Sequence, residues 1–84
     1  MIIELAIANY GGLMIPLTYA DINEQNVIGK ISGKQEIRKH LEDMGFVAGS
    51  IVTVVSSING NLIVNVKDTK VAIDKELAAR ILIQ

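Results

Sequence analysis

The side chains best suited to chemistry are two carboxylates and one imidazole that lie close together in the sequence, Glu36, His40 and Asp43. Spacings of four and three residues bring them to one side of a helix, and Fe²⁺ accepts imidazole and carboxylate ligands. His40 is the only histidine, however, cysteine is absent, and no second segment supplies further ligands. We therefore expect a charged helix face in solvent and no resident cofactor, with weak Fe²⁺ binding as the alternative.

Nucleophilic catalysis lacks the partners that it needs. A serine nucleophile requires a base that a third group holds in place, and a single histidine on the predicted helix supplies no such triad for any of the serines. A phosphate-binding loop is missing as well. Neither Gly29-Lys30 nor Gly33-Lys34 has the spacing and the following hydroxyl of the GxxxxGK motif that ends in Ser or Thr. The sequence thus predicts a protein that is not an enzyme.

Length, charge and composition restrict the function further. The 84 residues form one small domain. A net charge of −1, from 8 basic and 9 acidic residues, does not provide the basic surface that neutralises phosphates. The chain has 2 tyrosines, 1 phenylalanine and no tryptophan, which argues against base stacking. We therefore expect no nucleic-acid partner.

The apolar stretch of residues 1–15 has the pattern of neither a membrane span nor a secretory signal. Glu4, Asn9 and the Gly11-Gly12 pair interrupt it, whereas a spanning helix needs about 20 mostly apolar residues. Its first charge is acidic, and a signal begins with basic residues. The expected location is cytoplasmic.

The same 15 residues form an extension that differs from residues 16–84, and two interpretations remain open. In one, Met14 is the natural start and residues 1–13 are a translated leader, because codons for Gly11-Gly12 can spell a ribosome-binding signal. In the other, the alternation from Ile3 to Ile7 forms an N-terminal β-strand.

A helix is predicted over residues 33–44. Ser32 and Gln35 have the spacing of a capping box, and an apolar stripe recurs at helical spacing through Leu41. Gly45 stands where a helix end requires a left-handed residue, and Phe46 should pack back on the last turn.

Short β-rich runs make up the rest of the chain. Strands are predicted at residues 27–31, 51–55, 62–66, 71–73 and 81–83, with a turn at Gly49 and a hairpin at Asn59-Gly60. Asp74 is expected to cap a short helical turn. About five short strands avoid open edges by closing into a small barrel, with the helix inserted after the first barrel strand. The predicted fold is mainly β with short helices.

Three segments in order resemble the FeoA family (ferrous iron transport protein A). Ile37–Phe46 is similar to its helix end, Val47–Val54 to the strand that follows, and Val71–Ile81 to its C-terminal part. The resemblance covers residues 16–84. It departs at Ala48 and near Asn26, where the family usually has proline or a Pro-Gly turn.

The resemblance implies an SH3-like barrel and a cytosolic accessory protein of bacterial ferrous iron uptake. The family's partner is FeoB, a membrane transporter with a GTP-hydrolysing domain, which would bring this protein to the inner face of the membrane. The alternative is a metal-sensing or interaction module akin to the C-terminal domain of iron-dependent repressors.

A partner surface is expected around the predicted helix, because so small a barrel cannot bury all of its apolar side chains. The candidate contact residues are Arg38, Lys39, Leu41, Glu42, Gly45 and Phe46, although the helical stripe and the helix end favour a core position for Leu41 and Phe46. Residues 1–7 offer two further roles: they could cover an apolar patch of their own molecule, or they could dock on an edge strand of a neighbour in self-association.

Overall fold

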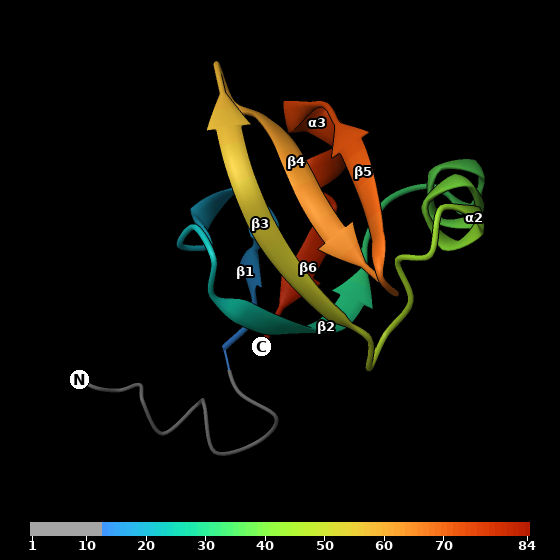
Figure 1. Ribbon diagram of the computed structural model, residues 1–84. Coiled ribbons are helices and arrows are strands. Elements are labelled where there is room, and N and C mark those ends of the chain that lie inside the picture. The colour runs from blue at the N-terminus through green and yellow to red at the C-terminus, as the bar shows by residue number, and fades with distance from the viewer. Residues whose placement is uncertain (1–12) are drawn as a thin grey trace.

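The computed structural model describes residues 13–84, which form a strongly curled β-sheet accompanied by two α-helices (Figure 1). The described elements are β1 (Ile15–Pro16), the 3-10 turn η1 (Leu17–Tyr19), β2 (Gln25–Ile31), α2 (Gln35–Asp43), β3 (Ile51–Ile58), β4 (Asn61–Val66), β5 (Thr69–Ile73), α3 (Lys75–Ala78) and β6 (Ile81–Ile83). They confirm the predicted mainly β fold with short helices. The interpretations of the N-terminal leader and the roles suggested for residues 1–7 concern residues 1–12, which lie outside the described part.

Neighbouring strands are antiparallel and follow the order β1-β6-β2-β3-β4-β5. Strand β2 connects the two halves of the sheet, because it pairs with β6 through Ile31 and with β3 through Val27. The register of β2 against β6 shifts between Ile28 and Lys30, at the bulge that Gly29 predicts. Such a bulge bends a strand, and the sheet curls around the core (Figure 1).

The sheet is not strictly closed, in contrast to the closed barrel expected from the short strands. Strands β1 and β5 are its two ends, and no pairing joins them within residues 13–84. Strand β1 has only two residues and ends in Pro16, which lacks the N–H that a ladder requires. The protein therefore has an open barrel.

Helix α2 begins later than predicted, and the capping role expected of Ser32 is wrong. Lys34 stands at the N-cap and makes no side-chain cap bond. Ser32 instead donates hydrogen bonds from its Oγ (3.1 Å) and its backbone N–H (2.8 Å) to the carbonyl oxygen of Arg80. Gly33 then has a positive φ of 109°. Because Ser32 is bound to the segment after α3, the helix starts only at Gln35.

The C-terminal end of α2 connects the helix to the core. Gly45 has a φ of 107°, and its N–H donates to the carbonyl oxygen of Glu42. The N–H of Phe46 donates to the carbonyl oxygen of Leu41 at 2.9 Å. These two bonds close the last turn of the helix, and both Leu41 and Phe46 are fully buried in the core. No helix within residues 13–84 is long and apolar enough to cross a membrane.

The core lies on the inner side of the curled sheet. In β3, Val52 and Val54 are buried, and they pair with Val66 and Val64 of β4, which are also buried. All buried side chains of the described part are apolar: Leu17, Ile28, Ile31, Leu41, Phe46, Val52, Val54, Leu62, Val64, Val66, Ile73, Ala78, Ile81 and Ile83. Because no polar side chain of residues 13–84 is buried in the core, the polar side chains of this part of the chain are at the surface.

Two hairpin turns of two residues each connect β3 to β4 and β4 to β5. Asn59 and Gly60 have φ values of 54° and 86° in the first, and Lys67 and Asp68 have 50° and 62° in the second. Two positive φ values identify a type I′ turn, for which Asn-Gly is a favoured pair. The first turn has the favoured residues, whereas the second has a lysine where left-handed backbone is uncommon.

Candidate functional site

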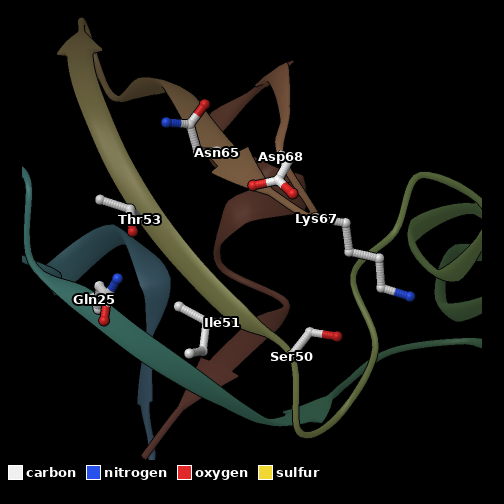
Figure 2. A pocket seen from close by; sticks show the side chains of 7 residues that line it. All are labelled: Gln25, Ser50, Ile51, Thr53, Asn65, Lys67 and Asp68. Carbon is white, nitrogen blue, oxygen red and sulfur yellow. The ribbon is translucent and has the colours of Figure 1, made fainter.

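The outer side of β2, β3 and β4 carries a hollow of about 660 Å³ (Figure 2). It is lined by Gln25, Ser50, Ile51, Thr53, Asn65, Lys67 and Asp68. Strands β2 and β4 supply the amide side chains of Gln25 and Asn65, and β3 supplies the residues at the centre. The turn between β4 and β5 supplies the two charged groups. Figure 2 shows these side chains around the path of β3.

The register of the sheet brings three of these residues into one row. Gln25 lies opposite Thr53, and Thr53 lies opposite Asn65. Residues directly opposite on antiparallel strands have Cβ atoms about 4.5–5.5 Å apart. Alternation along the strands then directs the three polar side chains outward, because their neighbours in β3 and β4 are buried valines.

The turn of Lys67 and Asp68 forms the rim of the hollow next to α2. A Cβ atom at Gly45 would lie 3.7 Å from Cγ1 of Val66 and 4.0 Å from Cδ of Lys67, so the end of α2 lies beside this turn. Figure 2 shows the Lys67 side chain extending toward α2, whereas the Asp68 carboxylate leaves the turn in another direction. The hollow and the end of α2 thus form one continuous surface.

The hollow has an apolar centre within a polar rim. Ile51 is 50% exposed, and the other six lining residues are polar or charged. None of these six side chains makes a hydrogen bond to another described residue. Protein interfaces combine an apolar centre with a polar rim in the same way, so the arrangement is suited to contact with another protein.

The lining residues can bind, but they do not form a catalytic constellation. Ser50 and Thr53 contribute hydroxyls, and a hydroxyl nucleophile needs a neighbouring base. No histidine lines the hollow, and the one carboxylate, that of Asp68, makes no hydrogen bond to either hydroxyl. What the hollow provides is a set of hydrogen-bond donors and acceptors around Ile51.

The metal candidates on α2 do not form a site in this structure. Glu36, His40 and Asp43 are all exposed on the helix. Within residues 13–84, no group of three or more histidine, aspartate or glutamate side chains is arranged to hold a metal ion. One helix face presents these side chains to solvent without a second element that could complete a coordination shell.

The residues predicted for partner contact divide into two groups. Arg38, Lys39 and Glu42 are exposed on α2 and can reach a partner. Leu41 and Phe46 are fully buried, in the core position that the sequence favoured for them over partner contact. Their apolar side chains fix the helix to the core and hold the exposed residues in place. Gly45 is half-buried beside the Lys67 turn.

The hollow itself was not predicted from the sequence. Its residues come from three strands, a loop and a turn, and they meet only through the register of the sheet. Two local signals point to it. Asn65 interrupts an otherwise apolar strand, and Lys67-Asp68 occupies a tight turn without glycine.

Comparison with known proteins agrees with this fold. The FeoA domain matches residues 15–84. The chain is 31% identical over 71 residues to the Methanocaldococcus jannaschii protein named Fe(2+) transport protein A, and the match covers 84% of this chain and 87% of that protein.

Two solved structures are similar over most of their length. One is an iron uptake regulatory protein, FeoA, with a TM-score of 0.78 and 28% identity over 86% of this chain and 96% of that chain. The other is Stenotrophomonas maltophilia FeoA complexed with zinc and described as an SH3 domain protein, with a TM-score of 0.73 and 22% identity over 83% of this chain and 89% of that chain. The likeness confirms the predicted SH3-like fold. Since the domain match extends from Ile15 to the last residue, the chain belongs to the FeoA domain family.

Proposed function

We propose that this protein is a non-enzymatic, cytosolic accessory protein of ferrous iron uptake, which binds and modulates the GTPase domain of a FeoB-type membrane transporter. Its family and a relative named for Fe(2+) transport support the role in iron uptake. The observation that carries the binding role is the half-exposed Ile51, surrounded by polar side chains without partners among the described residues.

The proposed contact surface consists of the hollow and the exposed face of α2. Ile51 would insert into an apolar depression of the partner, while Lys67 and Asp68 at the rim pair with opposite charges. Arg38 and Lys39 on α2 would contact acidic groups nearby. Because the net charge is only −1, the match depends on local pairs of charges and not on a long-range field.

Binding alone can modulate the transporter. A ligand shifts a conformational equilibrium only by its preference for one state. We expect this protein to bind one nucleotide state of the GTPase domain more tightly than the other. A tenfold preference corresponds to about 1.4 kcal/mol of coupling, a small amount for a surface of this kind.

An amide NMR titration of the full chain with the purified GTPase domain tests the proposal. Chemical shift changes should concentrate on Ile51 and its neighbours in the hollow, and on Arg38 and Lys39. Repeating the titration with GDP and with a non-hydrolysable GTP analogue measures the preference between states. A spectrum that does not move at high partner excess would contradict direct contact with this domain.

Two isoleucines of β3 provide a matched pair of variants for the same titration. Ile51 and Ile58 are 50% and 65% exposed, but only Ile51 lines the hollow. Ile51→Ser should weaken binding about tenfold or more, and Ile58→Ser should leave it unchanged. Equal effects of the two substitutions would show that the hollow is not the contact.

A further inference from the structure

Three exposed apolar side chains form a strip across the outer side of the sheet, beside the point where the described chain begins. Met14 precedes β1, Val27 belongs to β2 and Ile51 to β3, and they are 39%, 38% and 50% exposed. Isolated exposed apolar residues are ordinary, whereas contiguous apolar patches mark surfaces that bind another segment or protein. We call these three residues the apolar strip.

Contacts with Gly29 and Gln84 place Met14 beside β2, in a row that leads through Val27 to Ile51. The Sδ atom of Met14 lies 2.6 Å from the position that a Cβ atom of Gly29 would take, so the glycine makes room for Met14. Gln84 has its Cγ atom 3.2 Å from the same position and donates its backbone N–H to Val27 at 2.9 Å. Val27 in turn pairs directly with Ile51.

The segment that precedes Met14 in the sequence is rich in apolar residues. Leu13, the first described residue, is 64% exposed and directly precedes Met14. Residues 1–12 before it include Ile2, Ile3, Leu5 and Ile7. Each residue of an extended chain spans about 3.3 Å, and neighbouring strands lie about 4.8 Å apart. Twelve residues therefore exceed the length needed to run from Met14 across β2 to Ile51.

We propose that residues 1–12 dock on the apolar strip of their own molecule and cover Ile51. The connection through Leu13 favours this occupant over a second copy, because a short tether gives an effective concentration in the millimolar range. The inference does not depend on the proposed transporter partner. It has a consequence for any such partner, however: Ile51 also lines the hollow, so the docked segment and a protein bound there would exclude each other.

Thiol labelling tests the docking directly, because the natural chain has no cysteine. Ile51→Cys and the control Ile58→Cys are each prepared in the full chain and in a chain that lacks residues 2–12. In the full chain, Ile51→Cys should react with a maleimide about tenfold more slowly than in the truncated chain, as expected if the uncovered state is about 10% populated. Ile58→Cys should react at the same rate in both.

A full-length variant distinguishes loss of docking from a disturbance of the fold caused by truncation. Leu5→Asp should restore fast labelling of Ile51→Cys, because a buried charge opposes docking, while leaving the melting temperature of the domain almost unchanged. Equal labelling rates of Ile51→Cys in the full and truncated chains would overturn the proposal. Protection that appears only as the protein concentration rises would assign the occupant to a second copy and overturn it as well. No transporter is used, so failure here is distinct from failure of the proposed function.

Discussion

The double substitution Lys67→Asn/Asp68→Gly should stabilise the protein. Both residues have positive φ values, 50° and 62°, in the two-residue turn between β4 and β5. The other two-residue turn of the same sheet, Asn59-Gly60, already has the favoured residues at φ values of 54° and 86°. The exchange gives the second turn the sequence of the first without changing its length.

Most of the gain should come from Lys67→Asn. Left-handed backbone costs a residue such as lysine about 1–2 kcal/mol, and asparagine tolerates it better. At Asp68, glycine removes a smaller strain but adds about 0.5–1 kcal/mol of entropy to the unfolded chain, so the two effects nearly cancel. We expect a net gain of about 1 kcal/mol in the free energy of unfolding, which raises the melting temperature of so small a domain by about 4–8 °C.

Urea denaturation of the double variant, the two single variants and the reverse exchange at the other turn checks this reasoning. The reverse exchange, Asn59→Lys/Gly60→Asp, should lower the free energy of unfolding by about 1 kcal/mol or more. It also adds a Cβ atom 2.8 Å from Cδ of Lys75. The slope of the denaturation line should stay constant if only the turn changes. A Lys67→Asn variant that is no more stable than the natural chain would refute the assignment of strain to this turn.

Three further substitutions test the described contacts by thermal and urea denaturation. Phe46→Ala should cost about 3–5 kcal/mol, because the side chain is fully buried, whereas Phe46→Leu should cost much less; a small loss for Phe46→Ala would contradict the core position. Asp74→Ala should cost about 1 kcal/mol by removing the 2.8 Å cap bond to the N–H of Leu77, and Asp74→Asn should retain most of it. Gly49→Ala should cost about 1 kcal/mol from its φ of 91° alone, since no atom lies within 4 Å of the added Cβ; no loss there would count against the conformational argument.

The strands and the end of α2 could be predicted because their signals are local. Alternating valines define β3 and β4, Asn59-Gly60 defines their turn, and Gly45 marks the end of the helix. The start of α2 could not be predicted in the same way. Ser32 has a nearby capping partner in the sequence, but it binds the carbonyl of Arg80, 48 residues away. A long-range contact of this kind outweighs a local motif and is not visible in a single sequence.

The candidate site was predicted less well than the fold, for a related reason. Exposed charges on α2 follow from helical periodicity, and Arg38 and Lys39 are indeed exposed. The polar row of Gln25, Thr53 and Asn65 depends on the register of three strands. Register follows from the packing of the inner side and from the turns, so the residues that share an outer row emerge only once the whole sheet is assembled.

The hollow and α2 differ in how their exposed residues affect the stability of the fold. The pairs Arg38/Glu42 and Lys39/Asp43 on α2 have the i, i+4 spacing that stabilises exposed helices, so solubility and helix stability alone account for them. At the hollow, Lys67 and Asp68 occupy left-handed backbone, and Ile51 exposes half of an apolar side chain to water.

The left-handed backbone of Lys67 and the exposed apolar surface of Ile51 both oppose folding, and asparagine would tolerate the conformation of Lys67 better. Sequences break local rules chiefly where function requires it, which makes the hollow a stronger candidate for partner contact than the helix that local patterns favour. The turn exchange therefore also separates stability from recognition: the variant that gains about 1 kcal/mol in the free energy of unfolding should lose affinity for the partner, because it removes both charged side chains from the rim.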